Sequence, residues 1–216
     1  MFFYYFFNPS SWVSASTLTG FNNTGNVRIW PAEEAMIDYV HKNIPEKTLR
    51  SANIVELGGG FSNLCGQFLA KKYPDSTCYL TDGNHDSVAH CSKLIQENFI
   101  TNAICQVLRW DQPETFNFTQ SDCNNNDNYP EKIDLLLVAD CFFFDEYRLP
   151  LANCVKQFID NNPELRVIVI GPTRNGTFED FLEIVNGQLN KSEKAQFSTP
   201  AFYPADQNEI ILSVYN

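Results

Sequence analysis

The amino-acid sequence predicts an α/β protein with a doubly wound, mostly parallel sheet of seven strands that ends in an antiparallel C-terminal hairpin. Two observations lead to this prediction. Apolar runs typical of buried strands alternate with helix-like patterns five times along the chain, and such alternation is typical of right-handed crossovers in a parallel sheet. The last two apolar runs follow one another with only a polar turn between them, which favours an antiparallel edge.

The predicted elements follow in chain order. Pro31 suits the first turn of a helix, and apolar residues recur at helical spacing up to about Asn43. The apolar runs predict strands over residues 53–57, 77–82, 104–110, 133–140, 166–171, 195–203 and 209–215. The helical patterns between them predict helices over residues 61–72, 88–98, 146–160 and 177–189. The fourth strand is apolar almost throughout, as expected for a strand buried on both faces.

The chain of 216 residues is long enough for one domain with a full core. We assign that domain to residues 18–216 and leave the role of residues 1–17 open. The chain begins with an aromatic run from Met1 to Phe7. This run is too short to span a bilayer, which takes about 20 apolar residues, so no membrane partner is expected. An edge strand and a hydrophobic patch for a partner are the remaining interpretations, and we favour the strand.

Charge and cysteine usage argue against several classes of function. The net charge is −11, whereas binding to nucleic acid phosphates requires a basic surface, so no nucleic-acid partner is expected. The seven cysteines stand singly and there are only three histidines. Neither residue type shows metal-ligand spacing, so no metal site is predicted. Scattered cysteines in odd number are typical of reduced thiols. We therefore expect a cytoplasmic location. We also expect the nucleus as a second location, and a monomer.

The centre of the predicted site is the stretch 54–60, where an apolar run reaches Glu56. Three consecutive glycines follow: Gly58, Gly59 and Gly60. Glycine permits positive φ and a close approach of a ligand to the backbone. The next predicted strand ends on Asp82. This order of elements, in which a strand, a glycine turn and a helix are followed by a strand that ends on an acidic residue, is typical of a nucleotide-type site at the carboxyl edge of a parallel sheet. A turn without a ligand is the alternative, but the pairing with Asp82 favours a ligand.

The same residues favour a cationic ligand. A dinucleotide fingerprint needs glycine at its sixth position, where this chain has Asn63, so a nicotinamide cofactor is disfavoured. Glu56 would repel a pyrophosphate but suits S-adenosylmethionine, which carries an ammonium, a sulfonium and no phosphate. We expect Glu56 to meet the amino-acid end of that cofactor and Asp82 to accept both ribose hydroxyls. The alternatives are a charge partner for a helix N-terminus and a helix cap.

Together these motifs resemble the seven-strand S-adenosylmethionine-dependent methyltransferases, which have a Rossmann-like fold. The chain most resembles their protein-lysine branch, and within it the calmodulin-lysine N-methyltransferases. The stretches that carry the resemblance are residues 20–27, 29–34, 56–60, 80–84, 108–111 and 139–148. Residues 1–17 do not resemble the family. Phe143 stands where the lysine branch often has tyrosine, and in this respect the chain looks similar to the calmodulin enzymes.

The resemblance implies further contacts to the cofactor. Trp30, which by itself predicts only a core residue, would lie over the methionine end. Trp110 follows the third strand and would pack the adenine, with a core tryptophan as the alternative. Ala139 ends the fourth strand, opposite the glycine turn, and would complete the cofactor site.

The substrate side is predicted at Asp140, a carboxylate that ends a buried apolar run beside three aromatic residues. We expect Asp140 to contact the lysine amine, and Phe142 and Phe143 to form the walls of its channel. The resemblance points to calmodulin as the protein partner, at one lysine in the loop that links its last two EF-hands. Arg148 and Arg174 lie just beyond strand ends on the cofactor side, and we expect them to dock this partner.

Two other functions stay open. A lysine methyltransferase of the same branch that acts on another protein would use the same site and differ only in its substrate surface. A non-catalytic cofactor-binding or interaction module is the second alternative, and the hydrophobic N-terminal segment keeps it open. Such a module would have no need for Glu56, Asp82 and Asp140 together, which argues for turnover.

Overall fold

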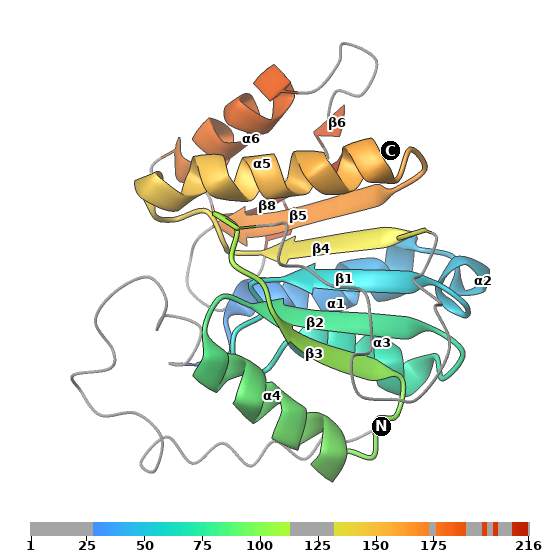
Figure 1. The fold of residues 1–216 in the computed structure, drawn as a ribbon. Helices are drawn as coiled ribbons and strands as arrows, with labels where there is room; N and C mark the ends of the chain where they lie inside the picture. Colours follow the sequence, from blue (N-terminus) through green and yellow to red (C-terminus); the bar gives the residue numbers. More distant parts are fainter. Residues whose placement is uncertain are drawn as a thin grey trace.

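The computed structural model describes residues 28–112, 132–172 and 176–188, and the backbone of three further strands near the C-terminus (Figure 1). Eight strands are present: β1 (Asn53–Leu57), β2 (Thr77–Asp82), β3 (Ala103–Val107), β4 (Leu135–Ala139), β5 (Arg166–Pro172), β6 (Gln196–Phe197), β7 (Ala201–Phe202) and β8 (Glu209–Tyr215). The helices of this part are α1 (Pro31–Asn43), α2 (Glu46–Leu49), α3 (Leu64–Lys72), α4 (His85–Glu97), α5 (Asp145–Asn161) and α6 (Thr177–Gln188). None of these helices is long and apolar enough to span a bilayer.

All eight strands form one sheet. Its order is β3-β2-β1-β4-β5-β8-β6, and β7 pairs with β8. The first five strands are parallel, and β8 runs antiparallel to β5. The chain leaves β1 towards β2 on one side and reaches β4 on the other, so the carboxyl ends of β1 and β4 flank a topological switch point. The predicted class, an α/β fold with a doubly wound and mostly parallel sheet, is confirmed.

The C-terminal edge differs from the prediction in its strand count. The single strand expected over residues 195–203 is divided into β6 and β7, both antiparallel to β8, so the described part of the sheet has eight strands instead of seven. Pro200 lies between the two short strands, and proline has no N–H to donate to a ladder. The turn of the expected hairpin, over 203–208, lies outside the described residues, as do residues 1–17.

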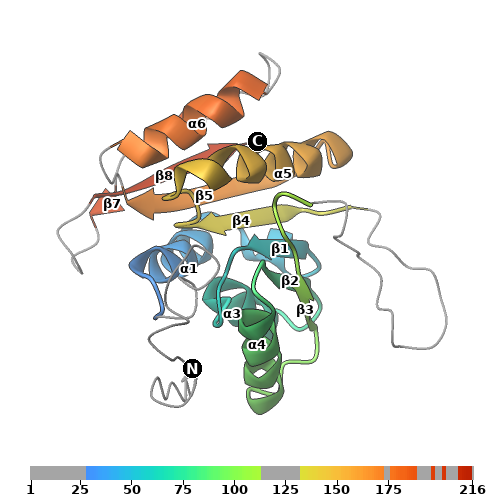
Figure 2. The same ribbon diagram turned by 60° about the vertical axis from the view of Figure 1, so that its left-hand side comes forward.

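Helices cover both faces of the sheet, and a hydrophobic core lies on each face (Figure 2). Helices α5 and α6 cover one face, and α1, α3 and α4 cover the other. Alternate residues of a strand point to opposite faces. Val55 and Leu57 of β1 therefore contribute to the α5 side, while Ile54 contributes to the α3 side. Glu56 shares the face of Ile54, which places its carboxyl group beneath α3.

Three boundaries near the strand ends differ from the prediction. Helix α3 begins at Leu64 rather than near residue 61, because Asn63 takes a left-handed φ of 40°. Strand β3 ends before Trp110, which lies in the following loop. Strand β4 ends directly before Asp140, whose φ of 53° turns the chain out of the sheet. The short helix α2 is absent from the prediction.

Candidate active site

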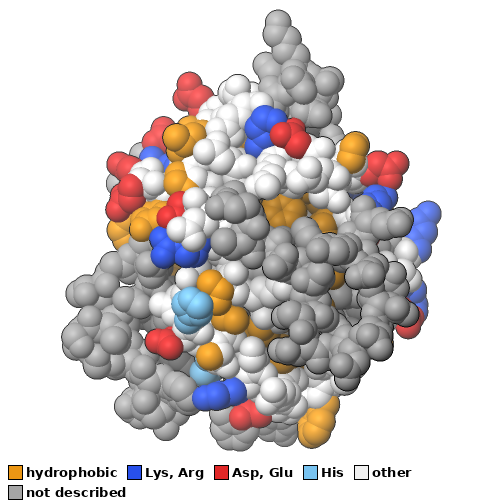
Figure 3. Space-filling view, viewed as in Figure 1, with side chains coloured by type: hydrophobic (Ala, Val, Ile, Leu, Met, Phe, Trp, Pro, Cys, Tyr) orange, Lys and Arg blue, Asp and Glu red, His pale blue; other side chains and the backbone are white. Residues whose placement is uncertain are grey.

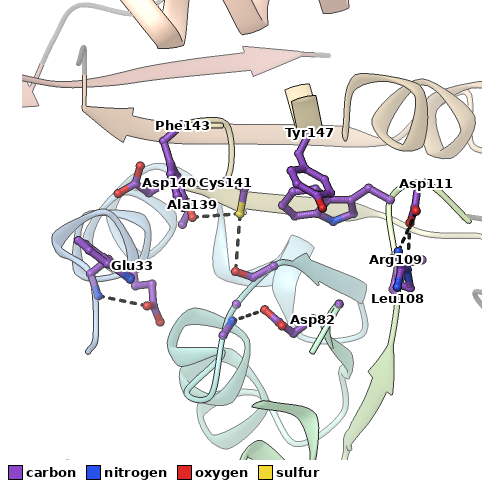
Figure 4. A pocket seen from close by; sticks show the side chains of 16 residues that line it. Glu33, Asp82, Leu108, Arg109, Asp111, Ala139, Asp140, Cys141, Phe143 and Tyr147 are labelled. Carbon is purple, nitrogen blue, oxygen red and sulfur yellow. Dashed lines mark hydrogen bonds and ion pairs between the residues drawn. The ribbon is translucent and has the colours of Figure 1, made fainter. Parts of the chain in front are cut away.

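A pocket opens at the carboxyl ends of β1, β2 and β4, at the switch point of the sheet (Figure 4). Its wall includes nine residues that the sequence singled out: Trp30, Gly58, Gly59, Gly60, Asp82, Trp110, Ala139, Asp140 and Phe143. The other lining residues are Glu33, Gly83, Leu108, Arg109, Asp111, Cys141 and Tyr147. One cavity therefore contains the glycine turn, the acidic end of β2 and the expected substrate side. The roles of these residues towards a ligand stay predictions.

The two ends of the pocket differ in chemistry. Figure 4 shows a group of residues that we name the Glu33 end, formed by Glu33, Asp140 and Phe143. On the opposite side lies the Arg109 end, formed by Leu108, Arg109 and Asp111. The Arg109 guanidinium donates to both carboxylate oxygens of Asp111, at 3.1 and 2.9 Å. The Glu33 end thus carries carboxyl groups, and the basic group of the other end is paired.

The glycine turn forms the floor of the pocket. Gly58 and Gly60 have φ values of 64° and 61°, which residues with a Cβ rarely adopt. A Cβ on Gly58 would lie 2.7 Å from the Cys141 sulfur and 2.8 Å from the Trp110 ring. The turn is anchored to β2 because the Gly59 N–H donates to the Thr81 carbonyl at 3.1 Å. Backbone, rather than side chain, therefore faces the cavity at this point.

Asp82 lies at the pocket wall and is held by two backbone groups. Its carboxylate accepts the Gly60 N–H at 2.9 Å through Oδ2 and the Asn84 N–H at 2.8 Å through Oδ1. Burial raises the pKa of Asp82 to about 6, although these hydrogen bonds oppose the shift. The cap of α4 is Asn84, whose side-chain oxygen accepts the Asp86 and Ser87 N–H groups. Asp82 is therefore not the helix cap, and the Ser87 side chain is a further hydrogen-bond partner of its carboxylate.

Replacing Asp82 by Ala is expected to weaken binding of S-adenosylhomocysteine by about 1.5–3 kcal/mol, the usual contribution of hydrogen bonds to a charged group. Calorimetry on the purified protein measures this directly. Asp86→Ala is a matched control, because Asp86 is an exposed carboxylate four residues further along the chain, in the first turn of α4. Unchanged affinity in a folded Asp82→Ala protein would show that this carboxylate only braces the glycine turn.

Glu33 is a lining residue to which the sequence analysis assigned no role. It lies in the first turn of α1 and is only 5% exposed. Its Oε1 accepts the Trp30 N–H at 3.2 Å, and its Oε2 accepts the Ser62 hydroxyl at 2.7 Å and the Leu64 N–H at 3.2 Å. Burial raises the pKa of Glu33 to about 7 against the effect of these three donors. This carboxyl group ties α1 to the end of the glycine turn.

Two tryptophans line the pocket from different elements. Trp30 is the N-cap residue of α1, and the Arg28 guanidinium carbon lies 4.4 Å from the centre of its ring. Trp110 follows β3, is 8% exposed and also belongs to the hydrophobic core on the α5 side. Trp110 therefore belongs to the core and also lines the pocket, and its packing against the adenine stays a prediction.

Asp140 and Phe143 lie on the segment between β4 and α5. Asp140 is 8% exposed, and its N–H continues the ladder by donating to the Ile170 carbonyl at 2.8 Å. Its left-handed φ is one that aspartate and asparagine tolerate better than most residues. The Phe143 ring packs against the Phe144 ring, with 4.8 Å between their centres. This segment brings a carboxyl group and an aromatic ring to the same end of the pocket.

Two residues expected at the site lie beneath it instead. Glu56 is 1% exposed and does not line the pocket; its Oε2 accepts the Gly66 N–H of α3 at 2.8 Å. The alternative noted for Glu56, a partner for a helix N-terminus, describes this contact. Phe142 is 1% exposed, and it packs against α6 through Phe178 and Phe181. It therefore cannot form a wall of the lysine channel in this structure.

Arg148 is also placed differently from the prediction. Its side chain is only 10% exposed and pairs with Asp145 at 2.7 Å and with Asp180 at 3.2 Å. The guanidinium also donates to the Phe142 carbonyl at 2.8 Å. These contacts join the start of α5 to α6, so we withdraw the docking role of Arg148. Arg174 lies outside the described residues.

The lining suits a cationic ligand. Four carboxyl groups line the pocket, those of Glu33, Asp82, Asp111 and Asp140, whereas Arg109 is the one basic side chain among the described lining residues. The glycines of the floor line the pocket without side chains, so a ligand can approach the backbone there. The described ranges contain no group of His, Cys, Asp and Glu side chains arranged to hold a metal ion. The fold and this site together define the class of S-adenosylmethionine-dependent methyltransferases.

Comparison with known proteins places the chain within that class. It belongs to the lysine methyltransferase family, whose model matches residues 17–188. Calmodulin-lysine N-methyltransferase of Arabidopsis thaliana is 27% identical to it over 166 residues. That match covers 75% of this chain and 50% of the relative, so the chain spans about half the length of the relative. Membership of the family identifies S-adenosylmethionine as the cofactor.

Solved structures support the same fold at lower sequence similarity. A SAM-dependent methyltransferase from Aquifex aeolicus superimposes with a TM-score of 0.57 at 10% identity, over 97% of this chain and 98% of that one. An rRNA methylase from Streptococcus thermophilus gives a TM-score of 0.55 at 13% identity, over 87% and 97% of the two chains. At such identities the likeness concerns the fold alone.

Proposed function

We propose that this protein transfers methyl groups from S-adenosylmethionine to the side-chain amine of a lysine in a protein substrate, and that the substrate is calmodulin. The observation that carries the reaction type is the arrangement at the Glu33 end of the pocket. Asp140 and Phe143 flank that end, and Asp82 and Trp110 lie along the rest of the wall. Ribose and adenine at Asp82 and Trp110 would direct the methionine end of the cofactor towards Asp140.

The cofactor supplies, when bound, a methyl group on a positively charged sulfur that is already activated for transfer. The protein must hold a neutral amine in line with that methyl group. A free lysine has a pKa near 10.4, so the ammonium has to lose a proton first. Phe143 lines the pocket beside Asp140 (Figure 4), and desolvation beside its ring would lower the pKa of the amine.

Asp140 has the opposite effect on the incoming amine. A nearby carboxylate favours the charged ammonium, so Asp140 would hinder deprotonation if that were its task. We therefore assign it to orientation: its oxygens accept the amine N–H bonds and hold the nitrogen lone pair towards the methyl group. The residue would act from a segment that β5 fixes, since its own N–H is bonded to Ile170.

Calmodulin is supported by the 27% identical relative and by the resemblance of the site motifs. The net charge of −11 works against long-range attraction of an acidic partner. Charges are screened beyond about 8 Å at physiological salt, so only the charges around the pocket mouth determine whether an acidic partner can dock. On the face shown in Figure 3, the described Lys and Arg side chains stand among acidic ones and do not gather into one patch. Because charges are screened over longer distances, docking would rest on short-range contacts at the pocket mouth.

Incubation with labelled S-adenosylmethionine is expected to label purified calmodulin. Calmodulin with and without calcium, and a variant whose lysine in the loop between the last two EF-hands is replaced by Arg, define the acceptor. The loop variant should lose the label. If calmodulin stays unlabelled while another protein of a cell lysate is labelled, the first alternative holds. If nothing is labelled although S-adenosylhomocysteine binds, the protein is a non-catalytic module.

A further inference from the structure

Glu33 combines three properties that none of the roles assigned so far explains. It lines the cofactor pocket, it is almost fully buried, and it is held as a carboxylate by two backbone N–H groups and one hydroxyl. A buried carboxylate usually has a basic partner, because burial of an unpaired charge is costly. Hydrogen bonds to Trp30, Ser62 and Leu64 supply the local stabilisation here, but none of these groups carries a charge.

The titratable groups around Glu33 supply no positive charge to balance it. Those that interact with it from the packed elements are the carboxyl groups of Asp82 and Glu56 and the thiols of Cys65 and Cys141. Asp140 shares its end of the pocket (Figure 4). Among the described basic groups, Arg109 lines the pocket but pairs with Asp111 at the opposite end, and Arg28 stacks on Trp30. A positively charged ligand group would therefore be stabilised at the Glu33 end.

We propose that Glu33 is the residue by which this site prefers the charged S-adenosylmethionine to its uncharged product, S-adenosylhomocysteine. The sulfonium favours the ionised form of Glu33, and this preference is lost when the uncharged product fills the pocket. In the reaction, the amine loses one proton to solvent and forms a bond to the methyl carbon. The bond from that carbon to sulfur breaks, and its electron pair stays on sulfur, which becomes neutral. The proposal concerns the cofactor alone, so it goes beyond the proposed function and holds for any methyl acceptor.

The hydrogen bonds of Glu33 permit this change of protonation. The Trp30 and Leu64 N–H groups can only donate, whereas the Ser62 hydroxyl can donate or accept. A proton on Oε2 could be donated to the Ser62 oxygen while both N–H groups keep their acceptors. The pKa of Glu33, raised to about 7 by burial, places the change near neutral pH. Uptake of the proton then costs no backbone hydrogen bond.

The test is the ratio of two affinities, measured by calorimetry between about pH 5.5 and 8.5. The sulfonium binds more tightly to ionised Glu33, so S-adenosylmethionine should gain affinity as pH rises through 7 while S-adenosylhomocysteine changes little. If the sulfonium lowers the pKa of Glu33 by about one unit, the ratio should rise about five- to tenfold over this range. Ribose, adenine and the amino-acid group occur in both ligands, so titration of Asp82 cancels in the ratio. Buffers with different ionisation enthalpies should show proton release with S-adenosylmethionine alone.

Three variants make the test specific. Glu33→Gln should flatten the pH dependence of the ratio. Ser62→Ala removes a hydrogen bond that lowers the pKa of Glu33, so it should move the midpoint to higher pH while keeping the slope. Glu56→Gln removes another buried carboxyl group, one that does not line the pocket, and should keep the slope as well.

A wild-type ratio that does not change with pH, or a folded Glu33→Gln protein with the wild-type slope, would overturn the proposal. If Glu33→Gln does not fold, the Ser62→Ala midpoint decides: an unshifted midpoint counts against it.

Discussion

Replacing Asp140 by Asn is expected to lower turnover at least about 100-fold, while the affinity for S-adenosylhomocysteine changes by no more than a few fold. The reason is that catalysis here depends on holding one amine nitrogen in line with the methyl group, and small misplacements at such a centre cost about two orders of magnitude. Asp140 flanks the end of the pocket where the methyl group would lie. Single-turnover kinetics with labelled cofactor and calorimetry with the product measure the two quantities separately.

Asn is the better first substitution because of the backbone. Asp140 has a φ of 53°, and Asn tolerates this conformation, whereas Ala there costs about 1–2 kcal/mol. Asp140→Ala should show the same loss of turnover together with a lower melting temperature. If cofactor affinity falls in parallel with turnover in the Asn variant, Asp140 belongs to the cofactor site and its assignment to the lysine amine is wrong.

The sheet and the glycine turn could be predicted because their signals are local. Strand ends are marked within a few residues by Glu56 and the glycines, by Asp82 and by Asp140. The parallel order follows from the alternation with helices. The position of Glu56 beneath α3 also follows from a local rule, since period two puts it on the same face as Ile54. The prediction that Glu56 contacts the cofactor overlooked this rule, although it can be applied to the sequence alone.

The remaining site features depend on contacts between distant segments. Glu33 reaches the pocket because Ser62 and Leu64, about thirty residues along the chain, come to its carboxyl group. Which of two consecutive phenylalanines faces the cavity depends on the turn at Asp140, and Phe142 goes to the core instead. No pattern along the sequence encodes these choices. A carboxylate in the first turn of a helix, such as Glu33, most often interacts only with the helix dipole.

Arg148 is another residue whose role depends on contacts between distant segments, and here the contacts affect the stability of the fold. From the sequence it is a cation beyond a strand end, whereas in the fold it is a buried link between α5 and α6 through Asp145, Asp180 and the Phe142 carbonyl. Arg148→Glu would place a carboxylate beside two others and leave the Phe142 carbonyl without its donor. Asp145 and Asp180 are 86% and 61% exposed, so their ion pairs with Arg148 contribute little. Leaving the buried Phe142 carbonyl without its donor costs about 1–3 kcal/mol, so the free energy of unfolding should fall by about that amount.

Urea denaturation followed by circular dichroism measures this loss, and Arg50→Glu is the matched control. Arg50 also pairs with a carboxylate, that of Glu46, but both side chains are more than half exposed, so its reversal should cost below about 1 kcal/mol. Arg148→Met would keep the apolar stem and should lose less than Arg148→Glu, because it adds no charge. If Arg148→Glu unfolds like the wild type and instead raises only the KM for calmodulin, the side chain is free to meet a partner and the original docking role is restored.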